Sequence, residues 1–390
     1  MSAENGAGVL GGASERVVSL DAFRGVTIAG MILVNNPGSW AYVYPPLAHA
    51  AWHGWTPTDL IFPYFLFILG VAVPYSFRRR LSEGAHRGDL VRHIARRSAI
   101  LVLLGLAMRA VPDFDVTTMR YYGVLQRIGI VYFFAATAYV YLGIRGRAGL
   151  TVLLLLGYWA VMTLVPVPGY GAGDLSPDGN LAAWLDRLLL DGHLWQDTWD
   201  PEGLLSTFPA IATALLGIFT GEWLQGDGKG LRTTGEGLPA EGEGLRKTRG
   251  MLLAGVVATA VGWGWGLLFP INKNLWTSSY VVFTAGTALV SLAALYWFID
   301  VRRLRGAWQE WMVVYGRNAI LVFVASGMMT KAMVRIRVDE GTSLYAWIYQ
   351  NVFRSWAGDY PGSVAFAASY VLFWLGIMWV LHRREIYLKV

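Results

Sequence analysis

The sequence predicts an all-α fold, a polytopic membrane helical bundle of about ten transmembrane helices. Three observations predict it. Charged residues make up only 15% of the 390 residues, where a soluble protein has about 25%. Hydrophobic residues reach 55% and gather in apolar runs of roughly 20 residues, the length that crosses a bilayer. Aromatic residues reach 14%, which suits the Trp and Tyr belts found at membrane surfaces.

The apolar runs set the order of the elements along the chain. Residues 1–17 are small and polar, with no basic segment before an apolar core, so we predict a disordered cytosolic leader and no cleavable signal peptide. Residues 18–390 are expected to form one transmembrane domain, with a flexible cytosolic loop over 225–249 and a large extracytoplasmic loop over 167–203. The predicted spans cover 18–40, 57–77, 98–112, 123–143, 149–166, 204–224, 250–269, 279–299, 311–333 and 363–382.

The placement of charge predicts how the bundle sits in the membrane. With ten spans both termini share one side, and 21 of the 32 Lys and Arg residues fall on that side. Cytosolic loops carry such an excess, so we expect both termini in the cytosol and the protein in the inner (plasma) membrane. The net charge of +6 follows from these loops and does not indicate nucleic-acid binding. The cysteine count of zero excludes thiol nucleophiles and Cys-based zinc or iron–sulfur sites.

Polar side chains inside the predicted spans are candidates for function, because burying them in hydrocarbon costs several kcal/mol unless they are paired or hydrated. Asp21 and Arg24 are compatible with a local i,i+3 ion pair and equally with an anion site. Buried arginines in later spans suit either structural ion pairs or ligand binding. The residues of this group are Asp21, Arg24, Asn35, Gln126, Arg127, Arg317 and Asn318.

Two histidines lie between the first two spans. The i,i+4 spacing of His49 and His53 would suit a metal pair on a helix, but no third ligand has convincing spacing, so we expect no metal site. Both residues also fit an interfacial position beside Trp52. The sharper interpretation is a neutral imidazole at His49 that acts as general base. Asp59 follows a Gly-Trp-Thr-Pro turn and is placed to fold back and orient that ring.

A second set of polar residues is predicted at the extracytoplasmic mouth. The Asn272–Asn274 stretch, which includes Lys273, follows Phe-Pro-Ile and suits either an interfacial turn or contacts with sugar hydroxyls. Asp200 and Glu202 precede a span on the same side. Polar groups spread through the membrane depth in this way fit a multi-pass transporter of sugars or sugar derivatives as well as an enzyme.

Motifs along most of the chain favour an enzyme over a transporter, because they resemble those of a known family. The sequence resembles the heparan-alpha-glucosaminide N-acetyltransferase family, within the wider transmembrane acyltransferase superfamily. The matching segments are SLDAFRG (19–25), MILVNNPG (31–38), HAAWHGWTPTDLIFPYFLFILG (49–70), GVLQRIG (123–129), DPEGLLSTFPAIATALLG (200–217), FPINKNLWTSSYVVFTAG (269–286) and GRNAIL (316–321).

The resemblance implies a membrane acetyltransferase and a homodimer. Cytosolic acetyl-CoA gives its acetyl group to the amine of a glucosamine-type sugar on the far side. The family's active histidine matches His49, its following aspartate matches Asp59, and its Val-Asn matches Asn35. The animal members have an extra luminal domain and leading span that this sequence does not match. We therefore expect a bacterial-type enzyme whose acceptor is a small amino sugar or a cell-wall or chitin-derived fragment.

We assign roles on this basis. His49 is the general base or a transient acetyl carrier, Asp59 sets its tautomer, and Asn35, Gln126 or Arg127 donates to the oxyanion. Arginine forks suit the phosphates of acetyl-CoA, with Arg78, Arg79 and Arg80 as further candidates. The residues assigned to the donor are Arg24, Asp21, Arg127, Gln126, Arg317 and Asn318. Those assigned to the acceptor are Asn272, Lys273, Asn274, Glu202, Asp200 and Trp52.

Overall fold

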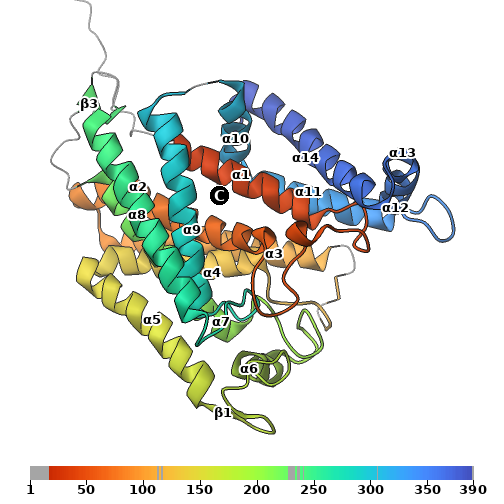
Figure 1. Ribbon diagram of the computed structural model, residues 1–390, viewed down its shortest axis with the longest axis horizontal. Coiled ribbons are helices and arrows are strands. Elements are labelled where there is room, and N and C mark those ends of the chain that lie inside the picture. The colour runs from red at the N-terminus through yellow and green to blue at the C-terminus, as the bar shows by residue number, and fades with distance from the viewer. Residues whose placement is uncertain are drawn as a thin grey trace, which may run out of the picture.

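The structure is a computed structural model that describes residues 17–111, 114–115, 117–226, 233–234, 238–239, 241–304 and 306–388. These residues form an almost entirely helical molecule in which long helices pack side by side (Figure 1). The all-α prediction is therefore confirmed. The predicted leader lies outside the described residues except for Val17.

The helices follow the predicted apolar runs closely. The long helices are α1 (Val18–Asn35), α2 (Ile61–Ser82), α3 (Arg87–Ala110), α4 (Val124–Tyr141), α5 (Ile144–Leu164), α7 (Leu204–Gln225), α8 (Glu241–Trp265), α9 (Ser278–Tyr296), α10 (Ala307–Arg317), α11 (Ala319–Arg335) and α14 (Asp359–Arg383). Shorter helical elements are η1 (Pro45–Leu47), η2 (Pro57–Leu60), α6 (Leu181–Leu190), η3 (Trp297–Val301), α12 (Leu344–Ile348), η4 (Tyr349–Arg354) and α13 (Ser355–Ala357). Two antiparallel ribbons pair β1 (Pro166–Val167) with β2 (Gly171–Ala172) and β3 (Thr233–Thr234) with β4 (Leu238–Pro239).

The protein is a multi-pass membrane protein. Within the described residues, seven helical segments are long and apolar enough to cross a membrane, and the bent pair α10–α11 makes eight. The two halves of that pair meet at Asn318 with a bend of 78°, where a single straight span was predicted over 311–333. The run is as apolar as a membrane-spanning helix, but its backbone is broken at Asn318.

Two predicted spans account for the difference from ten. The run 98–112 is the second half of α3, whose first half carries a dense group of arginines. The run 250–269 belongs to α8, which begins at Glu241, inside the predicted flexible loop 225–249. Both helices are present, but the charged residues in their first turns leave them less apolar than a membrane-spanning helix. The predicted count of ten spans is therefore not confirmed. The predicted loop 167–203 also contains ordered structure, namely α6 and the β1–β2 ribbon.

Glycines set the close crossing of α1 and α10. A Cβ added at Gly25 would stand 1.7 Å from the carbonyl oxygen of Met312, and one added at Gly316 would stand 1.9 Å from that of Asp21. The two backbones therefore touch where side chains would hold them apart. This crossing places Asp21 and Arg24 of α1 beside the break that follows α10.

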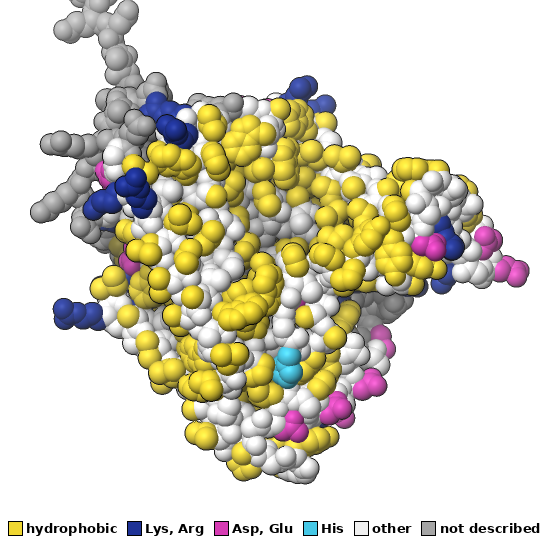
Figure 2. Space-filling view, in the orientation of Figure 1, with side chains coloured by type: hydrophobic (Ala, Val, Ile, Leu, Met, Phe, Trp, Pro, Cys, Tyr) yellow, Lys and Arg dark blue, Asp and Glu magenta, His cyan; other side chains and the backbone are white. Residues whose placement is uncertain are grey.

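Loops from three parts of the chain are fastened together at one end of the bundle. The amide of Gly54 donates to the carbonyl of Ile271 at 2.8 Å, and the indole N–H of Trp52 donates to the carbonyl of Leu175 at 2.8 Å. Figure 1 shows loops gathered near α6 in the lower half of the view. In Figure 2, Lys and Arg gather mainly along the upper and left edges and Asp and Glu along the lower right. The loops therefore create a polar end that is separate from the basic end.

Candidate active site

A histidine and a carboxylate are paired at the loop end of the bundle. Thr56 and Asp59 form a capping box at the start of η2, in which the N–H and hydroxyl of Thr56 donate to Asp59 Oδ2 at 3.0 and 3.1 Å. The N–H of Ala50 donates to the same oxygen at 3.0 Å. Asp59 Oδ1 lies 2.7 Å from His49 Nδ1. The capping box thus holds a fully buried carboxylate against the ring.

This pairing indicates which ring nitrogen of His49 carries the proton. Because the carboxylate only accepts, the proton of a neutral His49 belongs on Nδ1, and Nε2 keeps its lone pair. Asp59 is 1% exposed, whereas the side chain of His49 is 46% exposed and open to a substrate. An oriented, accessible imidazole of this kind has the geometry that a general base needs.

Lys273 is a third member of this group. Its Nζ lies 3.1 Å from both ring nitrogens of His49 and 3.9 Å from Asp59 Oδ1, and its side chain is 17% exposed. The turn that carries it is rigid. Asn272 is fully buried, its side-chain oxygen accepts from the N–H of Leu275 at 2.9 Å, and its Nδ2 lies 3.2 Å from His53 Nδ1.

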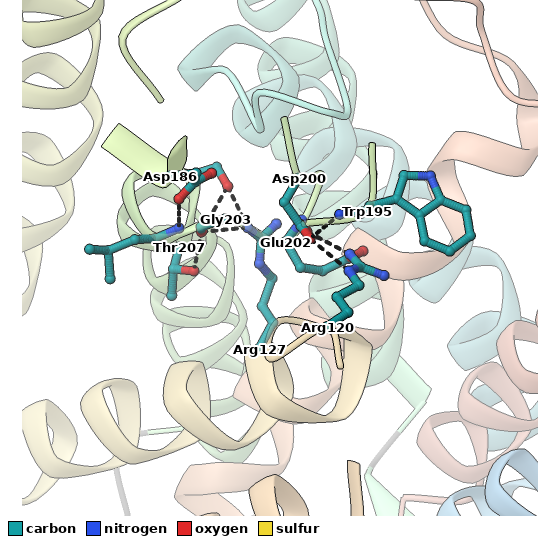
Figure 3. A network of polar contacts seen from close by, with 10 residues as sticks. Arg120, Arg127, Asp186, Trp195, Asp200, Glu202, Gly203 and Thr207 are labelled. Atoms are coloured by element: carbon teal, nitrogen blue, oxygen red, sulfur yellow. Dashed lines mark hydrogen bonds and ion pairs between the residues drawn. The ribbon is translucent and has the colours of Figure 1, made fainter. Parts of the chain in front are cut away.

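A buried ion network lies behind these loops (Figure 3). Arg120 donates to both oxygens of Asp200 at 2.6 and 2.5 Å and also to Glu202, while its guanidinium stands 5.0 Å from the ring centroid of Trp195. Arg127, from α4, donates to the carbonyl of Gly203 at 3.1 Å and to Ser206. Nε and one terminal nitrogen of Arg127 are buried without a hydrogen-bond partner.

The network also holds two carboxyls in opposite states. Burial alone would raise the pKa of Glu202, but Arg120, Arg127 and Lys273 outweigh it and hold that pKa below its ordinary value. Burial is the largest influence on Asp186 of α6 and raises its pKa to about 7. The charge of Asp200 acts in the same direction, and both outweigh the N–H of Leu204, Arg127 and Tyr122, which lower that pKa. Asp186 is therefore protonated in an appreciable fraction of molecules near neutral pH.

A basic cavity lies elsewhere in the bundle, between α1, α2, α3, α4 and the α10–α11 break. Its volume is about 540 Å³. Apolar residues such as Phe65 and Ile320 line one part of it, while His49, Asp59 and Lys273 are not among its lining residues. The polar lining side chains are Arg24, Ser76, His93, Arg96, Arg97, Tyr132 and Arg317. Four guanidinium groups around one cavity make a site for a polyanion.

Arg317 and Asn318 shape the mouth of this cavity. Asn318 binds the C-terminal segment on both sides, since its Nδ2 donates to the carbonyl of Ile386 and its Oδ1 accepts from the N–H of Leu388, each at 3.0 Å. Arg317 donates to the hydroxyl of Tyr387 at 2.9 Å. Among the residues that the structure describes, Nε of Arg317 has no hydrogen-bond partner and is buried, which leaves a donor for a ligand.

Comparison with known proteins matches these features to a family. A family model described as "Heparan-alpha-glucosaminide N-acetyltransferase, catalytic" matches residues 16–241, more than half of the chain. The chain belongs to this family. It is 29% identical over 430 aligned residues to the heparan-alpha-glucosaminide N-acetyltransferase of Homo sapiens, which covers 96% of the chain and 60% of that relative. The protein of the same name from Mus musculus is 28% identical over 432 aligned residues, covering 97% of the chain and 61% of the relative. The chain thus spans about three fifths of the length of these relatives.

The family resemblance drawn from sequence is thereby confirmed, and the structure sorts the residues assigned with it. His49, Asp59 and Lys273 come together, and Arg24 and Arg317 meet at the cavity. Asn35 ends α1 and is exposed, and no hydrogen bond joins it to His49 in the part of the chain that the structure describes. Its neighbour Asn36 is the buried one.

Other assigned residues lie away from the expected partners. Gln126 and Arg127, assigned to the donor, are not among the cavity's lining residues, and Arg127 belongs to the ion network. Asp200 and Glu202, assigned to the acceptor, are buried and bound to Arg120. Asp21 accepts from Arg24 at 3.2 Å, as the local ion pair predicts. Asn274 is half-buried in the Lys273 turn, and Trp52 packs edge-on against Trp199.

Sequence reasoning missed three residues of the cavity. His93, Arg96 and Arg97 of α3 were not assigned to the site, yet all three line the cavity. Their spacing carried the signal, because positions 93 and 97 are one helical turn apart and face the same way. His382 was not assigned to the site either, but its Nδ1 lies 3.3 Å from Nη1 of Arg317.

The idea of a metal pair loses its geometric basis. Residues 48–55 form bends and no helix, so the i,i+4 spacing of His49 and His53 does not place them on a common helical face. Within the described ranges, no group of three or more His, Asp or Glu side chains is placed to hold a metal ion.

Proposed function

We propose that this protein is a membrane acetyltransferase that transfers the acetyl group of acetyl-CoA to the amine of a glucosamine-type sugar. Membership of the family supports an acyltransferase. The observation that carries the proposal is the two-ended arrangement, with a base held by a carboxylate at one end and an arginine-lined cavity elsewhere in the bundle. The acceptor is a small amino sugar or a fragment of a larger glycan.

The donor's phosphates are bound by the cavity in this proposal. Arg24, Arg97 and Arg317 supply guanidinium groups, and the unpartnered Nε of Arg317 fits a phosphate oxygen. A narrow apolar gap shares Phe65 and Ile320 with the cavity and continues between α1 and α4. We assign the acetyl-pantetheine arm to this direction. An extended arm covers roughly half of the hydrocarbon thickness of about 30 Å.

The reaction follows from the His49 geometry. The acceptor amine attacks the thioester carbon, Nε2 of His49 takes the proton that the amine loses, and the thiolate of CoA leaves. Asp59 holds the Nδ1 proton and stabilises the imidazolium that forms. Asn35, Gln126 or Arg127 is the donor to the oxyanion. In the covalent version, Nε2 of His49 takes the acetyl group first and passes it to the amine.

The proposed arrangement in the cell follows the charge pattern. The arginine-lined cavity faces the cytosol, where acetyl-CoA is made, and His49 faces the extracytoplasmic side. Both termini are cytosolic, the membrane is the inner (plasma) membrane, and the protein is a homodimer. Asn274 and Trp52 contact the acceptor at the mouth. Asn272 and Lys273 shape that mouth, and Asp200 and Glu202 support it through Arg120.

The test uses purified protein in lipid nanodiscs with radiolabelled acetyl-CoA and a panel of amino sugars. We expect an N-acetylated product from the wild type and a loss of about 10²-fold or more in kcat for His49→Ala. His53→Ala, in the same loop, is the matched control. Acetyl-CoA should also raise the thermal stability of the protein. If the wild type acetylates no amino sugar and ignores acetyl-CoA, the proposal is wrong.

Trapping separates the two chemical versions. Incubation with labelled acetyl-CoA alone should leave acetyl on His49 if the covalent version operates, and the label should chase into product on addition of an amine. Product formation with no protein-bound acetyl, and only when both substrates are present, would exclude the intermediate and leave direct transfer.

A further inference from the structure

The ammonium group of Lys273 lies beside the proposed base. Its Nζ is 3.1 Å from Nδ1 and 3.1 Å from Nε2 of His49, so it stands against the ring whichever nitrogen carries the proton. General-base chemistry by His49 does not require a lysine at this position. The contact is nevertheless built into the fold, because Asn272 and Thr277 fix the turn with buried hydrogen bonds.

The charges around this contact come from four elements. Asp59 of η2 contacts His49 directly and favours its imidazolium form. Burial is the largest influence on Lys273 and lowers its pKa; Arg127 of α4 acts in the same direction, while Asp59 and Glu202, before α7, favour the ammonium form. His53 is in the same loop as His49 but contacts Asn272, and burial lowers its pKa. His49 therefore feels one close anion and one close cation.

We propose that Lys273 is a positioning residue that opposes protonation of His49 and so sets the lowest pH at which His49 works as a base. The inference rests on the proposed function, since it concerns the same base. A histidine paired only with a buried carboxylate would hold a second proton more tightly. A cation 3.1 Å from the ring offsets that attraction and leaves Nε2 free for the proton of the acceptor amine.

Lys273 affects the reaction through the release of a proton from His49. Each turnover moves one proton from the acceptor amine to Nε2 as the carbon–nitrogen bond forms and the carbon–sulfur bond breaks. The imidazolium must then release that proton before the next acceptor is bound. A nearby ammonium assists the release, whereas Asp59 alone would delay it.

The experiment compares pH profiles of kcat/KM for the wild type, Lys273→Met and Lys273→Arg. Removing the cation should move the acid limb of the profile to higher pH by about one unit, and the arginine variant should keep it near the wild-type position. Lys331→Met is the control, because Lys331 lies in α11 and its Nζ contacts the carbonyl of Val111 at 3.0 Å. Lys273→Gln serves as a second neutral variant should the methionine variant fail to fold.

A second readout needs no activity. Diethyl pyrocarbonate modifies neutral imidazoles, so its rate at His49, followed by peptide mass spectrometry, reports the neutral fraction of the ring at each pH. The Lys273→Met profile at His49 should move to higher pH, while the profile at His53, measured on the same peptide, should stay in place.

The outcomes separate the inference from the proposed function. If Lys273→Met loses activity with no displacement of either profile, the lysine is merely structural and the inference is wrong. If the wild type acetylates nothing, the proposed function fails, and the modification profile at His49 still decides whether Lys273 opposes protonation of that ring.

Discussion

The carboxylate of Asp59 serves two purposes at the scale of a single residue. It closes a capping box with Thr56 at the start of η2, and it fixes the Nδ1 side of His49. Because one buried side chain makes both contacts, the backbone that begins η2 and the orientation of the base cannot vary independently. The sequence separated the two residues by ten positions, and only the turn between them brings them together.

Replacing Asp59 with Asn tests this coupling. An amide can present its N–H₂ group to Nδ1, which would place the ring proton on Nε2 and remove the base. We expect kcat to fall by about 10²-fold or more with the fold retained. Steady-state kinetics and thermal unfolding check both parts. Asp115→Asn should leave kcat unchanged, because Asp115 is exposed and accepts from Thr117 in its own turn. Equal rates in the two variants would contradict the role of Asp59.

Arg317 offers a prediction for the donor site. Its buried, unpartnered Nε fits a phosphate oxygen, so Arg317→Met should raise the KM for acetyl-CoA by about tenfold and change kcat little. Initial rates at varied acetyl-CoA measure this. Arg92→Met is the control, since Arg92 is an exposed α3 residue that pairs with Asp89 at 3.0 Å. If only the KM for the amino sugar rises, Arg317 serves the acceptor and its assignment to the acetyl-CoA site is wrong.

At the scale of elements, the glycine crossing of α1 and α10 holds the cavity wall. Gly316→Ala would drive a methyl group into the carbonyl of Asp21, because the added Cβ would stand 1.9 Å away. We expect a loss of roughly 1–3 kcal/mol or more in stability, seen as a lower unfolding temperature in detergent. Gly376→Ala in α14 meets nothing within 4 Å and should not destabilise the protein. Similar unfolding temperatures for both variants would refute the close crossing.

The elements also show what sequence reasoning could reach. Apolar runs predicted every long helix, because a membrane-spanning helix needs about 20 apolar residues in succession. The break at Asn318 was missed because the run continues through it, and only the hydrogen bonds of Asn318 to the C-terminal segment explain it. His49, Asp59 and Arg317 were proposed as site residues from residue type and depth. Arg120, the partner of Asp200 and Glu202, was missed because the pairing bridges 80 residues.

The buried ion network around Arg120 and Arg127 makes stability depend on pH. The pKa of Asp186 is about 7 when folded and near its ordinary value of 3.8 when unfolded, so the folded state binds the extra proton between these values. The stabilisation that comes from the raised pKa of Asp186 is fully present below about pH 4. It is lost as the pH rises towards 7, which lowers the free energy of unfolding by at most about 4 kcal/mol. Asp186→Asn should flatten this part of the profile of unfolding temperature against pH. Asp197→Asn, at an exposed loop position, should not. An unchanged Asp186→Asn profile would contradict the raised pKa.

At the scale of the whole molecule, the proposed chemistry needs the two ends to face opposite sides of the membrane. The chain has no cysteine, so a single introduced thiol reports one position without background. Ser82→Cys lies at the end of α2, close to the arginines, and Gln196→Cys is exposed in the outer loop. An impermeant maleimide added to intact spheroplasts should label Gln196→Cys and should label Ser82→Cys only after lysis. The reverse pattern would place the arginine-lined cavity away from cytosolic acetyl-CoA. The proposed direction of transfer would then be wrong, even if His49 remained the base.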